Sequence, residues 1–139
     1  MTIRRLPPFL GLAALWACAP PDPPQRTRQN VTVAVTCSGN DVTFAVSPWY
    51  LELSEGDEVS WQLTQGQTIT IEPERGLFGA RWPFQDNKYA GGPGDNPTAS
   101  RMKGGQAGKS YRYVIAVTCT VGDSTRTVKL DPDVYIKRN

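Results

Sequence analysis

Cysteine is the residue type in this chain best suited to covalent chemistry, and the 139 residues contain Cys18, Cys37 and Cys119. The chain has no histidine, so it cannot build a Ser-His-Asp or Cys-His nucleophilic site, and it lacks the commonest general base. Carboxylates are the remaining acid–base groups, and we interpret their densest group, SEGDE at 54–58, as a solvated turn. We therefore predict no catalytic residue, no cofactor and no metal site, with an enzyme that uses carboxylates as an alternative.

Aromatic and cationic side chains gather in a Gly- and Pro-rich segment over 73–110, which shows little alternation. Large flat rings contribute binding energy at a small entropic cost, and neighbouring cations would complete a recognition surface for a protein or a glycan. The alternative is that Trp82 and Phe84 cover one end of the hydrophobic core. The predicted surface consists of Arg81, Trp82, Phe84, Tyr89 and Lys103.

The segment before Cys18 has the layout of an export signal. Arg4 and Arg5 precede LPPFLGLAALWA, an uncharged apolar run that is too short to span a bilayer. LWAC at 15–18 resembles the lipobox of bacterial lipoproteins, in which a small residue precedes the cysteine and Leu lies three places before it. The resemblance implies that the signal peptide, residues 1–17, is removed and that Cys18 is acylated. Ordinary secretory cleavage after Ala19 is the alternative.

Residues 18–30 would then be a lipidated cysteine and an extended tether, because they are rich in proline and polar residues. Several acyl chains would hold the protein on a membrane surface without spanning it. The resemblance implies an exported, lipid-anchored protein of the cell envelope. Ala19, where an Asp is absent, implies the outer membrane if the species has two membranes.

The net charge of the chain without its signal peptide indicates which class of partner it can bind. Removing Arg4 and Arg5 from the 15 basic residues leaves 13, against 13 acidic residues. This neutrality argues against a nucleic acid held through phosphate contacts. The predicted partners are the membrane, through the lipid anchor, and an envelope protein or glycan.

Cys37 and Cys119 remain as a pair if Cys18 carries lipid, whereas three cysteines would otherwise leave one thiol unexplained. Each lies on the apolar side of an alternating run, VTVAVTC at 31–37 and YRYVIAVTCTV at 111–121. An oxidising compartment lets a bond between them persist. The sequence predicts a disulfide.

Period-two alternation runs through 31–139 and predicts a single all-β domain. DVTFAV, DEVSWQL and TITIE each place apolar residues on one face, and PWYLEL puts Trp49 on the same face as Leu51 and Leu53. Turn residues separate these runs, and no window shows a helical period. We expect a Greek-key sandwich of about seven strands with Trp61 in its core.

Three segments, SEGDEVSWQL at 54–63, YRYVIAVTC at 111–119 and KLDPDVYI at 129–136, resemble cupredoxins. The order WPF, MKGG, YRY, Cys, DPDVYI resembles the copper-free cupredoxin-like domains of bacterial exported proteins. Cupredoxins hold copper with two His, a Cys and usually a Met, so the lack of histidine implies this fold without copper. An electron-transfer or metal-binding protein of the cupredoxin type is the alternative function.

An immunoglobulin-like sandwich is the alternative fold, because Cys37, Trp61 and Cys119 occur in the order found in that family. In either fold, the sequence predicts a non-catalytic lipoprotein of the envelope. Its domain, residues 31–139, would act as a binding or structural module whose ligand the sequence does not name.

Overall fold

The computed structural model describes residues 25–39, 41–65, 68–76, 79–80, 82–92 and 94–138. These residues form strands and no helix, which confirms the predicted all-β class. The first six strands are β1 (Arg28–Ser38), β2 (Asp41–Ser47), β3 (Tyr50–Leu53), β4 (Glu58–Leu63), β5 (Thr68–Pro73) and β6 (Arg75–Gly76). The others are β7 (Gly79–Ala80), β8 (Tyr89–Gly91), β9 (Thr98–Ala99), β10 (Ser110–Val121), β11 (Ser124–Leu130) and β12 (Asp133–Ile136).

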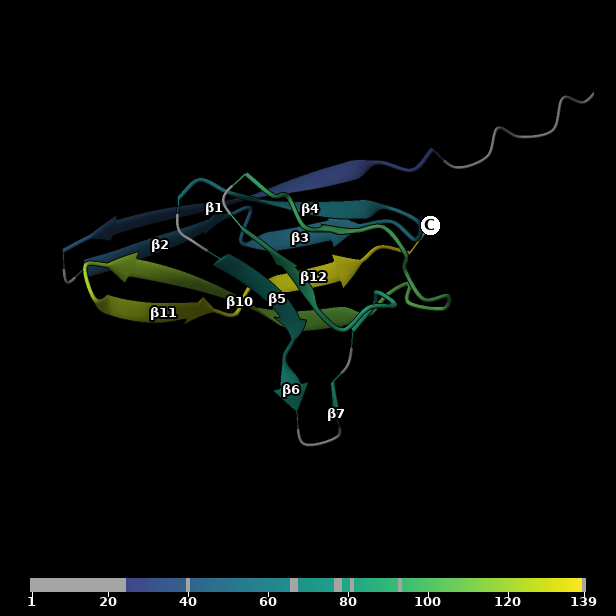
Figure 1. Cartoon of the computed structure of the whole chain (residues 1–139). Coiled ribbons are helices and arrows are strands. Elements are labelled where there is room, and N and C mark those ends of the chain that lie inside the picture. The colour runs from purple at the N-terminus through teal and green to yellow at the C-terminus, as the bar shows by residue number, and fades with distance from the viewer. Residues whose placement is uncertain are drawn as a thin grey trace, which may run out of the picture.

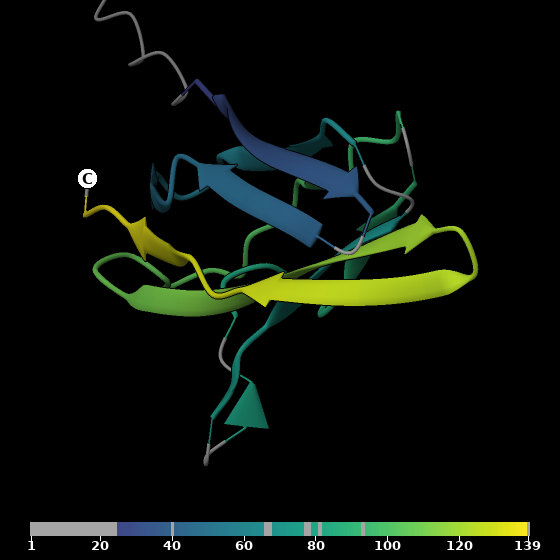
Figure 2. The same cartoon turned by 90° about the vertical axis from the view of Figure 1, so that its left-hand side faces the viewer.

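Two sheets pack face to face as a sandwich (Figure 2). The smaller sheet has the strand order β2-β1-β4-β9, and the larger has the order β3-β12-β10-β5-β8, with β11 also paired to β10. Both sheets are mixed, because β1 pairs with β4 in parallel and β3 pairs with β12 in parallel. The expected sandwich is confirmed.

Alternation along the strands builds the core. In β1 the side chains of Val31, Val33 and Val35 are buried while those of the residues between them are exposed. β10 repeats the pattern over most of its length. Trp61 is also buried, as predicted, among apolar side chains of both sheets. One apolar and one wet face per strand are what such alternation produces in a half-buried sheet.

The predicted disulfide is confirmed. Cys37 lies on β1 of the smaller sheet and Cys119 on β10 of the larger sheet, 82 residues apart in sequence. Their Cα atoms are 6.1 Å apart, within the range that a disulfide spans. The bond therefore joins the two layers of the sandwich covalently.

The chain changes sheets between β2 and β3. β2 ends at Ser47 in the smaller sheet and β3 begins at Tyr50 in the larger one, so only Pro48 and Trp49 make the crossing. Pro48 cannot donate to a strand ladder. The predicted placement of Trp49 on the buried face is wrong: its side chain is 47% exposed, because the alternation of β3 does not extend through the crossing.

The folded part begins earlier than the predicted boundary at residue 31. β1 starts at Arg28, which is in register with Glu58 of β4 and forms an ion pair with it at 2.9 Å. Thr27 donates both its N–H and its hydroxyl to the Asp57 carboxylate. These contacts fix residues that the polar composition had assigned to the tether.

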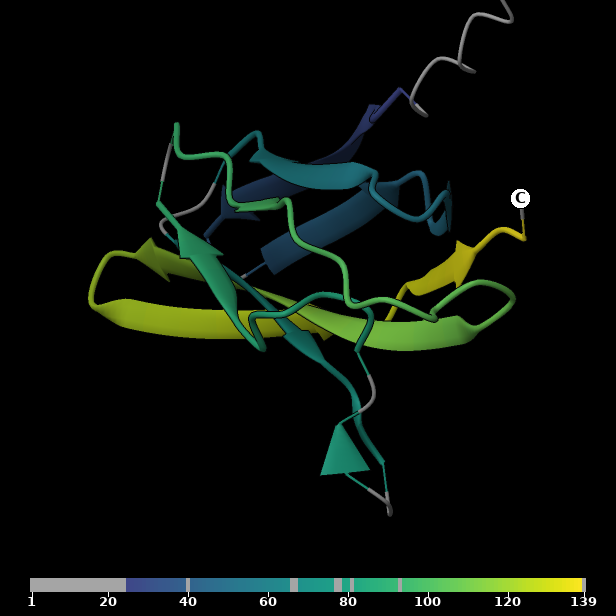
Figure 3. The ribbon, with the colours of Figure 1, turned by 90° about the vertical axis from the view of Figure 1, so that its right-hand side faces the viewer.

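The segment over 73–110 contributes to both sheets, although the sequence predicted little regular structure there. β8 pairs with β5 of the larger sheet and β9 pairs with β4 of the smaller one. Phe84, which precedes β8, and Met102, which follows β9, form an isolated antiparallel bridge. β6 and β7 pair with each other in a hairpin that projects from the sandwich (Figure 1, Figure 3). These short strands are why the strand number exceeds the expected seven.

Candidate binding site

The two central residues of the predicted aromatic surface, Trp82 and Phe84, are buried. Trp82 and Phe84 are 3% and 1% exposed, and their rings meet edge to face with centroids 5.2 Å apart. The Trp82 indole N–H donates to the backbone carbonyl of Asp86 at 2.9 Å. The alternative that both rings complete the core is therefore the correct one, and the prediction that they form an exposed patch is wrong.

The remaining members of the predicted surface are divided. Tyr89 is half-buried and packs on Phe84 at a centroid distance of 6.4 Å. Lys103 is exposed, and its backbone N–H donates to Pro83. Arg81 lies outside the described residues, as does Cys18. The described members of the predicted surface therefore do not form one exposed patch.

A buried aromatic cluster takes the place of that surface. Tyr113 packs against Trp61 and Trp82 at centroid distances of 5.9 and 5.7 Å. Burial raises the pKa of Tyr113 to about 12, partly opposed by the nearby Trp61 indole N–H. The two groups are close, but neither the indole N–H nor the Tyr113 hydroxyl has a hydrogen-bond partner in the described part of the chain. The cluster is a packing unit with an unsatisfied polar centre.

The exposed aromatic residues lie elsewhere. Among the described residues, the large hydrophobic side chains that remain exposed are Trp49 and Tyr50, at 47% and 48%. Tyr50 begins β3, which is at the edge of the larger sheet and pairs with β12 alone. Alternation extended through Pro48 does not predict this exposed pair, although a proline before two aromatic residues is a signal of a break.

Acidic and aromatic neighbours complete an outer β3 surface, defined as Trp49, Tyr50, Glu52, Asp133 and Tyr135. Tyr50 is in register with Asp133 and Glu52 with Tyr135, while the intervening leucines point into the core. Partial burial is the largest cause that raises the pKa of Tyr50. The nearby Glu52, Tyr135 and Asp133 raise it further, in that order. This surface is therefore aromatic and acidic.

An arginine from β10 reaches the acidic side chains of this region. Arg112 of β10 lies 3.3 Å from the Asp133 carboxylate and 3.9 Å from Glu74. All three side chains are well exposed, and ion pairs in such settings contribute little to stability. They place a positive charge beside the outer β3 surface, on the side that faces β10.

The carboxylates of SEGDE make contacts that hold neighbouring backbone and side chains. Asp57 is only 5% exposed, so the interpretation of this group as a wholly solvated turn is wrong for Asp57. Its Oδ2 accepts the N–H of Ser54 at 2.8 Å, and its Oδ1 accepts the two Thr27 donors. All of these contacts are to structural donors, so Asp57 closes the turn. Within the described ranges, no three Cys, Asp or Glu side chains gather as a metal site would require.

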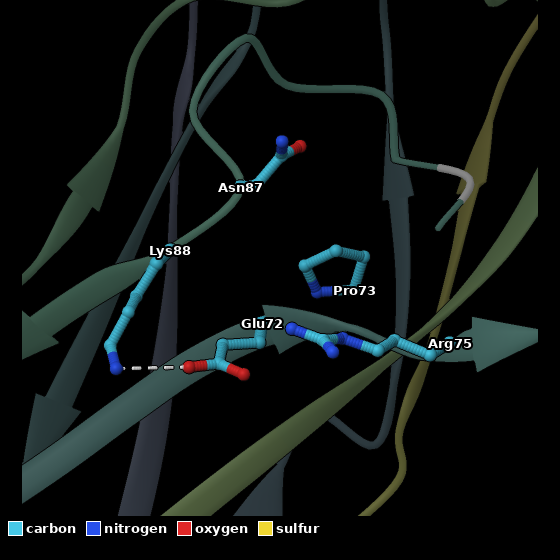
Figure 4. A pocket seen from close by; sticks show the side chains of 5 residues that line it. All are labelled: Glu72, Pro73, Arg75, Asn87 and Lys88. Carbon is cyan, nitrogen blue, oxygen red and sulfur yellow. Dashed lines mark ion pairs between the residues drawn. The ribbon is translucent and has the colours of Figure 1, made fainter. Parts of the chain in front are cut away.

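An open pocket of about 360 Å³ lies beside the end of β5 and is lined by Glu72, Pro73, Arg75, Asn87 and Lys88. Figure 4 shows Lys88 joined to Glu72, at 3.1 Å, and Arg75 extending toward Glu72 below the proline ring. The Arg75, Asn87 and Lys88 side chains are exposed. Because solvent competes for each of these donors, the pocket does not hold them in a fixed arrangement.

No protein-family model matches the chain, and no curated protein sequence is significantly similar to it. None of the described segments is a helix with the length and apolar character needed to cross a bilayer.

Proposed function

We propose that the protein is a non-catalytic lipoprotein of the bacterial cell envelope, anchored through Cys18, whose β-sandwich acts as a binding or structural module. The exposed Trp49–Tyr50 pair carries this proposal. Among the described residues, the other large apolar side chains of the domain are buried. Two adjacent aromatic side chains that remain in solvent are therefore typical of an interaction site.

The outer β3 surface suits an envelope protein or a glycan. Both can present a flat apolar face to Trp49 and Tyr50, and both can donate hydrogen bonds to Glu52 and Asp133. β3 has only one neighbouring strand, so the surface is open along its edge. Trp49 and Tyr50 are already exposed to solvent, so a partner can cover them without any rearrangement of the core.

The strand pairing supports the predicted cupredoxin-like fold over its immunoglobulin-like alternative. An immunoglobulin domain is built from two antiparallel sheets, whereas each sheet here contains a parallel pair, β1 with β4 and β3 with β12. The chain has no histidine, so the two imidazole ligands of a cupredoxin copper site are missing. On these grounds we propose that the domain is cupredoxin-like and copper-free.

The anchor is tested by the intact mass of the protein extracted from membranes. We expect a chain that begins at Cys18, carries acyl groups and lacks two hydrogens because of the Cys37–Cys119 bond. A chain that begins after Ala19, or one with an unmodified Cys18, would exclude the lipid anchor.

The binding module is tested with the variant Trp49→Ala/Tyr50→Ala. Loss of a central aromatic pair typically costs about 2 kcal/mol or more, so retention on purified peptidoglycan, or cross-linking to a protein from a cross-linker placed at position 52 in cells, should fall roughly 30-fold. The variant Trp49→Phe/Tyr50→Phe should keep most of the binding, and Lys129→Ala on exposed β11 should keep all of it. Equal retention and cross-linking by the double alanine variant would refute the proposal.

A further inference from the structure

A second cavity is lined by residues from both ends of the described chain, Gln25 and Lys137 among them. Figure 1 shows these two ends at the same end of the sandwich. This terminal pocket has a volume of about 620 Å³. The lining side chains that matter for the argument are Arg26, Thr27, Ser54, Glu55, Asp57 and Lys137. Two of them are cations that approach from opposite ends of the chain.

The two carboxylates of the terminal pocket are engaged in holding its walls. Asp57 accepts three hydrogen bonds, from the Thr27 N–H and hydroxyl and from the Ser54 N–H. Glu55 accepts the backbone N–H groups of Gln106 and Ala107 at 2.6 and 3.0 Å. The segment before β1, the 54–57 turn and the 104–109 turn are thereby fixed around the cavity.

The cations of the terminal pocket are not neutralised in this way. Among the described residues, ion pairs engage Arg28, Lys88 and Arg112, but neither Arg26 nor Lys137. The Lys137 N–H donates to Leu53, which places the residue beside the 54–57 turn.

Two more cations lie on the same end. The Lys109 carbonyl accepts the N–H of Ile136 at 2.9 Å. A Cβ atom at Gly108, whose φ is +78°, would collide with the Arg138 guanidinium, so Arg138 packs on this turn. Arg26, Lys109, Lys137 and Arg138 thus share this end of the sandwich with the carboxylates of Glu55 and Asp57. The Arg28–Glu58 pair adds no net charge, so this end is net positive.

The length of the chain places this end near the membrane. Gln25 follows Cys18 by seven positions, and an extended chain spans at most about 3.6 Å per residue, or roughly 25 Å in all. If Cys18 is acylated, the terminal pocket lies within that distance of the lipid headgroups, whereas the β1–β2 and β10–β11 turns lie at the opposite end (Figure 1).

We infer that the terminal pocket binds the phosphate of an anionic phospholipid headgroup, with the Arg26 guanidinium and the Lys137 ammonium as donors. The inference rests on the proposed lipid anchor. Arg presents a donor fork that matches phosphate, and Lys adds a point charge. Each cation near an anionic surface contributes about 1 kcal/mol, so the pocket seats the sandwich on its membrane with its terminal end down. The outer β3 surface then stands at the side of the domain, open to a partner.

The test uses the full protein extracted from membranes and placed in nanodiscs of phosphatidylglycerol or of phosphatidylcholine. Acetylation of each lysine is followed by mass spectrometry. Lys137 should be modified about fivefold more slowly in the anionic discs, in line with one cation contact, and 0.5 M salt should remove the difference. Lys129, which pairs with Ala116 in the middle of β10 and lies outside the terminal pocket, should react equally in both discs.

Matched variants remove one arginine each. Arg26→Gln should abolish most of the protection of Lys137, whereas Arg75→Gln, in the pocket beside β5, should leave it unchanged. Equal reactivity of Lys137 in both discs would overturn the inference. Protection by inorganic phosphate alone in phosphatidylcholine discs would overturn it as well, by assigning the pocket to a soluble anion. The intact mass of the same sample reports Cys18 acylation separately, so failure of the anchor and failure of the pocket are distinguishable.

Discussion

Reduction of the Cys37–Cys119 bond should remove a large part of the stability of the sandwich. The bond closes a loop of 82 residues, and in the chain-entropy model such a closure lowers the entropy of the unfolded chain by about 15 cal/mol/K, or roughly 4.5 kcal/mol at 25 °C. Domains of this size are typically stable by about 5–15 kcal/mol. The reduced protein should therefore be marginally folded.

Equilibrium urea unfolding measures this loss, because the buried indoles of Trp61 and Trp82 report the transition by fluorescence. With a slope of about 1–2 kcal/mol/M, the midpoint should fall by roughly 2–4 M on reduction. Cys37→Ala, Cys119→Ala and the double variant should each lose a similar amount, because either change opens the same loop. A loss below about 1 kcal/mol on reduction would refute the view that this bond constrains the unfolded chain.

Three further predictions concern individual side chains. Tyr113→Phe removes a buried hydroxyl that has no hydrogen-bond partner among the described residues, so urea unfolding should show a gain of about 1 kcal/mol. Wild-type stability should fall by roughly 2–3 kcal/mol from pH 10 to pH 12. The reason is that unfolded Tyr113 ionises near pH 10 and folded Tyr113 near 12, and Tyr113→Phe should lack this part of the decline. Asp57→Ala leaves the donors of Thr27 and Ser54 unpaired and should cost about 2–4 kcal/mol, whereas Glu72→Gln, in an exposed ion pair, should change stability by less than about 0.5 kcal/mol.

The strands were predictable because alternation reports directly on which side of a strand faces water. Val31, Val33 and Val35 are buried as their spacing predicts, and so is Trp61. The disulfide followed from the same pattern, since both cysteines continue core-facing runs. The alternation could not report where β2 leaves one sheet and β3 enters the other, because both runs look the same on either side of Pro48.

The candidate site was harder to predict than the fold. Trp82 and Phe84 stand in an irregular segment, and nothing in their spacing distinguishes a ring in the core from a ring in solvent. Trp82 packs on Tyr113 of the distant strand β10, and Tyr113 in turn packs on Trp61 of β4. The terminal pocket also depends on long-range contacts, because Asp57 binds Thr27 and Glu55 binds the turn at 106–107.

The crossing at Pro48 and Trp49 connects the fold to the proposed function. Two residues are too few to carry the chain between sheets and also turn the indole of Trp49 into the core. An aromatic side chain buries about 150–250 Å², so the 47% of Trp49 that stays exposed leaves about 2–3 kcal/mol of apolar burial unrealised. Tyr50, directly after it on the edge strand, adds a similar area. A partner that covers both rings would gain this free energy without any change in the core, which is why the interaction site is expected at this crossing and not among the buried rings of the 73–110 segment.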